Sequence, residues 1–247
     1  MSEATYDGVT GEELAHALSL PRVDVHGDVP STMDLANALA AAGAPAGTLV
    51  LADSQAAGRG RAGRRWESHA GDGIWLTLIE RVNDPEALDV LSLRIGLRVA
   101  RVLDRFNPDP VGVKWPNDLF LPAGKLGGVL LESRWRGGRP EWTSIGIGIN
   151  VRAVHHPGAA ALGAGVSRVH VLQELVPAVR AATVARGRLT SIELSEFAAR
   201  DIAMGRACRE PRIGRVQGIA SDGALLIQTE QGITRVLEGS LVLEGSD

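Results

Sequence analysis

The segment GRGRAGRRW, residues 58–66, places four arginines among three glycines. Its glycines match the pattern G-x-G-x-x-G, in which backbone N–H groups bind a phosphate. Arginine guanidinium groups form paired hydrogen bonds with phosphate or carboxylate, and glycines keep a loop flexible. The segment therefore predicts a mobile cationic loop that closes over an anionic reactant. The alternative is a solvated arginine–glycine loop without a ligand.

Other kinds of phosphate site fit this segment poorly. A Rossmann unit needs a helix after the third glycine, but only RRWESHAGDG, residues 64–73, separates Gly63 from the predicted strand at Ile74. A Walker loop needs G-K-S or G-K-T, and Gly124-Lys125 is followed by leucine. The catalytic and metal-binding motifs of protein kinases are not found.

Two lysines mark further candidate positions. The chain has 26 Lys and Arg residues, of which only Lys114 and Lys125 are lysine. A lysine ammonium is a compact charge that a planar guanidinium does not replace. Lys114 begins KWPNDL, in which Asp118 could hold Mg²⁺ or accept a hydrogen bond from a ligand, or in which Asn or Asp only caps a turn. Lys114 could also neutralise phosphate. Lys125 lies in GKLGGVLLES, where a strand is expected to begin beside Gly127 and Gly128. The alternative is that the two lysines survive by chance in an arginine-rich composition.

The strand SIGIGIN, residues 144–150, alternates isoleucine with glycine. Successive side chains of a strand point to opposite faces of the sheet, so the isoleucines predict a buried face. Gly146, Gly148 and Asn150 share the opposite face. Glycine inside a strand often marks the close approach of a ligand or another backbone. This bare face predicts either the floor of a binding site or the seat of a tightly packed helix.

The composition limits the class of protein. Of 247 residues, 45% are hydrophobic and 22% are charged, as is usual for a globular chain. The net charge of −3 argues against a general nucleic-acid binder. Cys208 is the only cysteine, which excludes an internal disulfide framework and a cysteine zinc cluster. No secretory signal or membrane span is visible, and a cytoplasmic location is expected.

Periodicity and turn residues predict the elements that must position these groups. Ser31 is expected to cap the first helix, and RGGRP to form a hairpin turn. Strands are expected at about 23–27, 48–54, 73–80, 111–115, 125–135 and 141–151. Helices are expected at 31–43, 84–106, 168–186 and 191–204, with a loop at 153–167.

The chain changes character near its C-terminal end. From Arg212 onward, short strands follow each other closely, with turns at SDG and QG. Such spacing is typical of a small barrel or sandwich. The sequence therefore predicts an α+β domain at residues 1–206 and a small β domain at residues 207–247.

Five segments together resemble the motifs of biotin protein ligases, in the same order and at similar spacing. They are Ser31-Thr32, GRGRAGRRW, KWPNDL, GKLGGVLLES and GIGIN. The resemblance implies a mixed β-sheet covered by helices, as in class II aminoacyl-tRNA synthetases, followed by an SH3-like β-barrel. One departure is Met33, where asparagine often follows the Ser-Thr pair, and little effect is expected from it.

The resemblance also implies the chemistry. Biotin and ATP would give biotinyl-5′-AMP and pyrophosphate, and a lysine of a biotin carboxyl carrier protein domain of an acetyl- or acyl-CoA carboxylase would then take the biotinyl group. Mg²⁺ would assist, without a tightly bound cofactor. The alternatives are a lipoate or octanoate protein ligase or transferase, and a biotin-binding module without turnover.

By the same resemblance, specific residues are expected in the site. Biotin would contact Ser31, Thr32, Gln55, Gly58, Arg59, Arg61, Trp75, Lys125, Gly128, Gly146 and Gly148. ATP or the adenylate would contact Arg61, Arg64, Trp66, Lys114, Asn117, Asp118 and Asn150. Arg59, Arg61 and Lys125 would act in catalysis, and Asp118 would bind Mg²⁺.

The expected partners are few. Some relatives carry an N-terminal winged helix-turn-helix that binds DNA, and the Ser-Thr pair at residue 31 leaves too little chain before it for such a domain. The expectation is therefore a monofunctional ligase that binds neither DNA nor a membrane, as a monomer or weak homodimer.

Overall fold

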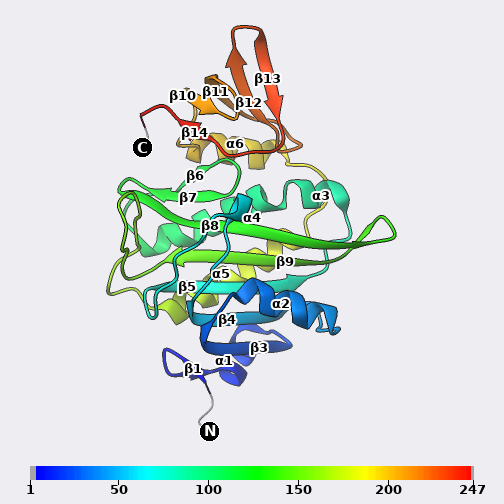
Figure 1. Cartoon of the computed structure of the whole chain (residues 1–247), viewed down its shortest axis with the longest axis vertical. Coiled ribbons are helices and arrows are strands. Elements are labelled where there is room, and N and C mark those ends of the chain that lie inside the picture. Colours follow the sequence, from blue (N-terminus) through cyan, green and yellow to red (C-terminus); the bar gives the residue numbers. More distant parts are fainter. Residues whose placement is uncertain (1–3, 246–247) are drawn as a thin grey trace.

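The computed structural model describes residues 4–245, which form a long molecule with two main sheets (Figure 1). The larger sheet has the strand order β3-β4-β5-β9-β8-β7-β6. Its strands are β3 (Arg22–Val29), β4 (Thr48–Gln55), β5 (Gly73–Glu80), β6 (Gly112–Lys114), β7 (Asp118–Leu121), β8 (Gly124–Arg136) and β9 (Arg139–Asn150). Because β3 and β4 are parallel while the other neighbours are antiparallel, the sheet is mixed.

The helices cover both faces of this sheet. They are α1 (Gly11–Leu18), α2 (Thr32–Ala41), α3 (Pro85–Asp89), α4 (Leu91–Leu103), α5 (Arg168–Thr183) and α6 (Ser191–Arg200), with short 3-10 turns η1 (Arg61–Gly63) and η2 (Asp104–Phe106). Helices α4 and α5 form the main core with the isoleucine face of β9, as the alternation in SIGIGIN predicted. Helix α2 packs on the opposite face, where its alanines meet Val50 and Ile79 (Figure 1).

The smaller sheet lies at one end of the molecule (Figure 1). It has the order β13-β12-β11-β10-β14 and consists of β10 (Ala207–Glu210), β11 (Gly214–Ile219), β12 (Leu225–Thr229), β13 (Gly232–Val236) and β14 (Val242–Leu243). Its turn at Gly223 lies so close to Val90 and Leu93 that a Cβ atom added to Gly223 would meet both, and the indole N–H of Trp115 donates to the Gly223 carbonyl at 2.9 Å. The two sheets therefore share one continuous hydrophobic core.

The structure corrects several predicted elements. The helix expected at 84–106 is divided at Val90, which is fully buried, so hydrophobic periodicity continues through the break and conceals it. Helices α5 and α6 end earlier than expected, at Thr183 and Arg200. Strands β7 and β10 were not predicted, nor were helix α1 and the hairpin of β1 (Thr5–Tyr6) and β2 (Val9–Thr10).

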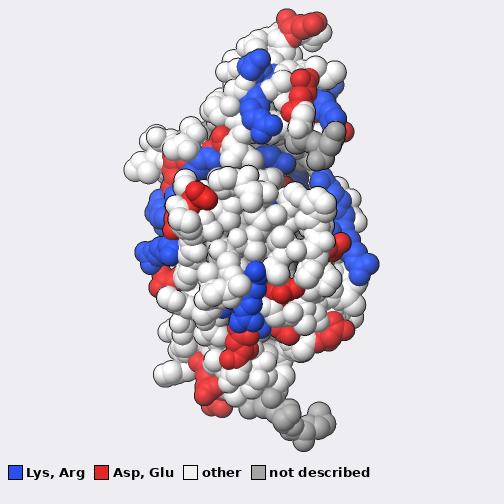
Figure 2. Space-filling model, turned by 90° about the vertical axis from the view of Figure 1, so that its left-hand side faces the viewer, with Lys and Arg blue, Asp and Glu red and all other residues white. Residues whose placement is uncertain are grey.

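On the face seen in Figure 2, basic and acidic side chains are interspersed with uncharged surface. Within residues 4–245, none of the helices combines the length and hydropathy needed to cross a bilayer.

Candidate active site

A cavity of about 510 Å³ lies on the glycine face of the larger sheet. Its walls come from the start of α2, the end of β4, the loop at residues 56–72, strands β6 to β9 and the C-terminal segment at 240–243. Fifteen of the expected site residues line it, and Gly58 and Trp75 do not; the fifteen are Ser31, Thr32, Gln55, Arg59, Arg61, Arg64, Trp66, Lys114, Asn117, Asp118, Lys125, Gly128, Gly146, Gly148 and Asn150.

The floor of the cavity depends on glycine. A Cβ atom added to Gly148 would lie 2.6 Å from the indole of Trp66, and one added to Gly146 would lie 2.7 Å from the terminal methyl of Met33. Real Cβ atoms do not approach other atoms so closely, so only glycine allows these two side chains to lie on the sheet. Trp66 and Met33 therefore form apolar walls directly above the bare face of β9.

One end of the cavity is polar and uncharged. The Thr32 N–H and hydroxyl both lie close to the Gln55 side-chain oxygen, at 2.9 and 3.1 Å, and the Gln55 amide donates to the Ser68 hydroxyl at 2.8 Å. The Thr32 and Thr77 hydroxyls are 2.9 Å apart. These bonds orient the end of β4 against the start of α2, so the polar groups at this end are preorganised.

Ser31 differs from its expected role. It occupies the N-cap position of α2, but its side chain makes no capping hydrogen bond. Its hydroxyl is buried and has no partner within residues 4–245. A buried hydroxyl without a partner is costly, and this one lies in the cavity wall, where a ligand can satisfy it.

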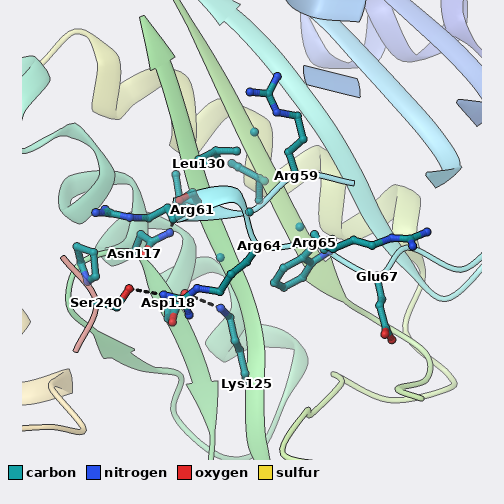
Figure 3. Close-up of a pocket in the computed structure, with 18 of the residues that line it drawn as sticks. Arg59, Arg61, Arg64, Arg65, Glu67, Asn117, Asp118, Lys125, Leu130 and Ser240 are labelled. Carbon is teal, nitrogen blue, oxygen red and sulfur yellow. Dashed lines mark hydrogen bonds and ion pairs between the residues drawn. The ribbon is translucent and has the colours of Figure 1, made fainter. Parts of the chain in front are cut away.

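The other end of the cavity is cationic. The Lys125 ammonium lies 2.7 Å from an Asp118 carboxylate oxygen and 5.3 Å from the centroid of the Trp66 ring. Lys114 lies 4.9 Å from the Phe120 centroid, and burial lowers the pKa of its ammonium, which the nearby Asp118 charge partly offsets. Figure 3 shows Lys125 and Asp118 facing each other across this end of the cavity.

Two loop arginines join this cationic end. The Arg64 guanidinium donates to the Ser240 hydroxyl (Figure 3). The Arg61 guanidinium donates to the Gly239 carbonyl at 3.4 Å. Burial is the largest cause of the lowered pKa of Arg61, but an arginine stays protonated at neutral pH. The tip of the loop is therefore held against the C-terminal segment, and the loop adopts a closed conformation.

The structure places four expected residues differently. Gly58 forms the base of the loop, where its carbonyl accepts a hydrogen bond from the backbone N–H of Trp66 at 2.8 Å. Trp75 lines a smaller cavity with His69 and His155, and its ring edge faces Trp66 with the centroids 6.3 Å apart. Asn117 and Asn150 do line the main cavity, but their amide groups donate to backbone carbonyls of Val129, Lys125 and Ala160.

Arg59 is the clearest difference from expectation. It borders the cavity, but its guanidinium pairs with Asp34 and Glu132, each at 2.6 Å. In Figure 3 its side chain points away from Arg61, Arg64 and Lys125. Arg61 and Arg64 therefore contact the C-terminal segment, whereas Arg59 pairs with acidic side chains outside the cavity.

Several lining residues were not found from the sequence. Met33 was regarded as a neutral departure, and His156 and residues 240–243 were not considered. The C-terminal segment carries no local pattern that indicates a site, because only the packing of the smaller sheet brings it to the cavity.

The acidic residues give limited support for a metal ion. Within residues 4–245, no three His, Cys, Asp or Glu side chains gather in a way that could hold one. Mg²⁺ often binds through one or two carboxylates together with substrate phosphates. Asp118 lies at the cationic end and fits the role of one such ligand for an ion that arrives on a nucleotide.

Comparison with known proteins places this site in a family. Residues 27–150 match the model of the biotin/lipoate A/B protein ligase family. The bifunctional ligase/repressor BirA of Bacillus subtilis is 30% identical over 237 residues, which are 88% of this chain and 73% of that protein. A biotin–acetyl-CoA-carboxylase ligase of Mycobacterium tuberculosis is 38% identical over 136 residues, which are 53% of this chain and 49% of that protein.

A solved structure supports the same assignment. The biotin protein ligase of Aquifex aeolicus in complex with biotin and ATP superimposes with a TM-score of 0.74 at 27% identity, covering 91% of this chain and 99% of that one. The predicted α+β fold class, with a mixed sheet followed by a smaller β unit, is thereby confirmed. The chain belongs to the biotin/lipoate A/B protein ligase family, and it is an enzyme of the biotin–protein ligase type.

Proposed function

We propose that this ligase activates biotin as biotinyl-5′-AMP and transfers the biotinyl group to a lysine of a biotin carboxyl carrier protein domain. The observation that carries the proposal is the polarity of the cavity. One end offers uncharged hydrogen-bonding groups around the unpartnered Ser31 hydroxyl, and the other gathers Arg61, Arg64, Lys114 and Lys125. The neutral ring system of biotin matches the uncharged end, and its carboxylate tail and the nucleotide phosphates match the cationic end.

The uncharged end suits the ureido group of biotin. A ureido group has one carbonyl acceptor and two N–H donors. The Ser31 hydroxyl can donate to the carbonyl, and the oxygens of Thr32 and Gln55 can accept from the N–H groups. Met33 and Trp66, which lie on the glycine floor, provide apolar contacts for the fused rings.

The cationic end suits the first chemical step. A biotin carboxylate oxygen attacks the α-phosphorus of ATP, and the bond from that phosphorus to the bridging oxygen breaks as pyrophosphate leaves. Both reactants are anions, so their approach is opposed unless fixed positive charges surround them. Lys125 lies where the carboxylate meets the α-phosphate in this proposal, and it would stabilise the charge that develops there. Arg61, Arg64 and Lys114 would hold the phosphates in line.

Mg²⁺ bound to the ATP phosphates would supply further neutralising charge, with Asp118 as its protein ligand.

In the second step the acceptor lysine nitrogen attacks the acyl carbon of the anhydride. The C–O bond to AMP breaks, AMP leaves with the electron pair, and the nitrogen loses a proton as the amide forms. The closed loop at residues 56–72 would shield the anhydride from water between the two steps.

The predicted division at residues 206 and 207 is also part of the proposal. The smaller sheet contributes residues 240–243 to the cavity wall and anchors the loop tip. We therefore propose that the C-terminal unit, residues 207–247, takes part in the activation step. Biotin-dependent exchange of labelled pyrophosphate into ATP tests the first step, and labelling of a carrier domain by biotin tests the second.

A further inference from the structure

The side chain of Arg59 links the base of the arginine–glycine loop to two acidic side chains outside the loop. Arg59 Nη1 lies 2.6 Å from Asp34 Oδ1, in the first turn of α2, and Arg59 Nη2 lies 2.6 Å from Glu132 Oε1, on β8. The guanidinium thus joins a helix and a strand that are distant in sequence. Neither carboxylate lines the cavity.

One of these carboxylates, Glu132, belongs to a wider hydrogen-bond network. The second Glu132 oxygen accepts from the Asn37 amide at 2.9 Å, and the Asn37 oxygen accepts from the Ser144 hydroxyl at 2.7 Å. Glu132 is therefore held in place by α2 and β9 before it meets Arg59. A preorganised partner loses less side-chain freedom when the pair forms, so this contact favours a defined loop position.

The other loop arginines have different partners. Arg61 and Arg64 reach the C-terminal segment at the loop tip, while Arg65 donates to the Ala56 carbonyl at the loop base. The Arg59 guanidinium is directed away from Lys125 and Asp118 (Figure 3). Both terminal nitrogens of Arg59, Nη1 and Nη2, are paired with carboxylates in this closed conformation, so its forked face is turned to Asp34 and Glu132 and not to an anionic ligand.

We propose that Arg59 is a positioning residue whose pairs with Asp34 and Glu132 latch the loop shut, rather than a residue that contacts biotin or phosphate. The consequence for catalysis rests on the proposed function: the latch retains biotin and the adenylate but does not stabilise the transition state of adenylation. Loss of the latch raises the KM for biotin and the escape of adenylate, while kcat for adenylation stays nearly constant.

The effect is moderate because the pairs are partly exposed. Arg59 is 43% exposed, Asp34 56% and Glu132 28%. Exposed ion pairs contribute little individually, so loss of both pairs should raise the open fraction of the loop about three- to tenfold. The loop arginines are trypsin sites, so the open fraction can be measured directly as a cleavage rate.

The test uses the full chain with Asp34→Asn, Glu132→Gln and the double variant. Trypsin cleavage between residues 59 and 65 is measured without ligand, and should be about three- to tenfold faster in the double variant. With labelled biotin and Mg-ATP but no acceptor, adenylate should escape into solution faster by a similar factor. The maximal rate of biotin-dependent ATP–pyrophosphate exchange should stay within about twofold of the parent.

Glu174→Gln is the matched control, since it removes a similar exposed pair with Arg105, and neither residue lines the cavity. It should change none of these measurements. Asp34→Asn alone keeps the test valid if Glu132→Gln disturbs the Asn37 network, because the hydrogen bonds of that network join Asn37 to Glu132 and Ser144 and do not pass through Asp34.

Two results would overturn the latch. The first is an unchanged cleavage rate in the double variant. The second is a loss of maximal exchange rate in Arg59→Gln that greatly exceeds the loss in the double variant, since this would place Arg59 on the substrate. The cleavage measurement needs neither biotin nor ATP, so failure of the latch and failure of the proposed activity are seen separately.

Discussion

The Lys125 ammonium lies 2.7 Å from the Asp118 carboxylate at the cationic end of the cavity. The same ammonium lies 5.3 Å from the centre of the Trp66 ring, which rests on the glycine floor. The strand pairing of β7 with β8 sets this geometry, because Asp118 is opposite Gly128 and Lys125 is opposite Phe120. Lys125 is thus fixed before substrates bind, as a stabiliser of developing charge should be.

Lys125→Ala should therefore slow adenylation much more than it affects folding. Loss of a preorganised charge partner costs about 100-fold or more in rate, and the ammonium is not part of the hydrophobic core. Pyrophosphate exchange at saturating biotin and ATP measures the rate, and thermal unfolding serves as the control. A rate within about fivefold of the parent would show that Lys125 does not act at the reacting atoms.

Ser31→Ala should weaken biotin binding without loss of stability. The Ser31 hydroxyl is buried and has no partner within the described chain, so its removal sacrifices no hydrogen bond in the free protein. Loss of one bond to the ureido carbonyl should raise the KM for biotin about tenfold. Thr32→Val is the contrasting variant, because it breaks the hydroxyl contacts with Gln55 and Thr77 and should lower the unfolding temperature.

Gly148→Ala should displace Trp66 from the sheet. A Cβ atom at this position would lie 2.6 Å from the indole, and overpacking of this kind costs about 1–3 kcal/mol of unfolding free energy. Tryptophan fluorescence and pyrophosphate exchange should both change. Gly27→Ala, in β3, is the matched control because no atom lies within 4 Å of the added Cβ. If Gly148→Ala and Gly27→Ala show the same stability, fluorescence and exchange rate, Gly148 is not needed to seat Trp66 on the sheet.

The pH dependence of stability should depend on Asp201. Burial raises the pKa of this carboxyl from 3.8 to about 6, and one of its oxygens has no hydrogen-bond partner within residues 4–245. The folded state therefore binds the proton more tightly than the unfolded state. The protonated Asp201 carboxyl therefore contributes to the stability of the folded state below about pH 4, and this contribution is lost as the pH rises through about 6.

Asp201→Asn removes this titration, so the variant should gain stability relative to the parent between pH 4 and pH 7. Urea unfolding at several pH values measures the difference in unfolding free energy. If the difference in unfolding free energy between Asp201→Asn and the parent does not change with pH, the Asp201 carboxyl has the same pKa in the folded and unfolded states.

The sequence was most informative where local patterns decide the structure. The bounds of β5, Gly73–Glu80, agree with the prediction because glycine and charged residues flank a run of apolar residues. The alternation of Ile and Gly in β9 likewise predicted which face is buried and which is bare. Both features depend on neighbouring residues alone.

Tertiary packing decided the rest. The ion pairs of Arg59 could not be predicted, because its partners, Asp34 and Glu132, are distant in the sequence. Ser240 could not be associated with the cavity, since only the docking of the smaller sheet brings it there. Ser31 was expected to cap α2 because serine favours that position, and it does occupy the N-cap position, but its hydroxyl makes no capping hydrogen bond.

One cavity is proposed to join a biotin carboxylate to the α-phosphate of ATP. Exchange of labelled pyrophosphate into ATP is the sharpest test of this joining, because exchange requires reversible formation of the adenylate and needs no acceptor protein. We expect exchange that depends on biotin and is lost in Lys125→Ala. Exchange that is absent with biotin in the folded parent protein, or that proceeds equally well without biotin, would contradict it.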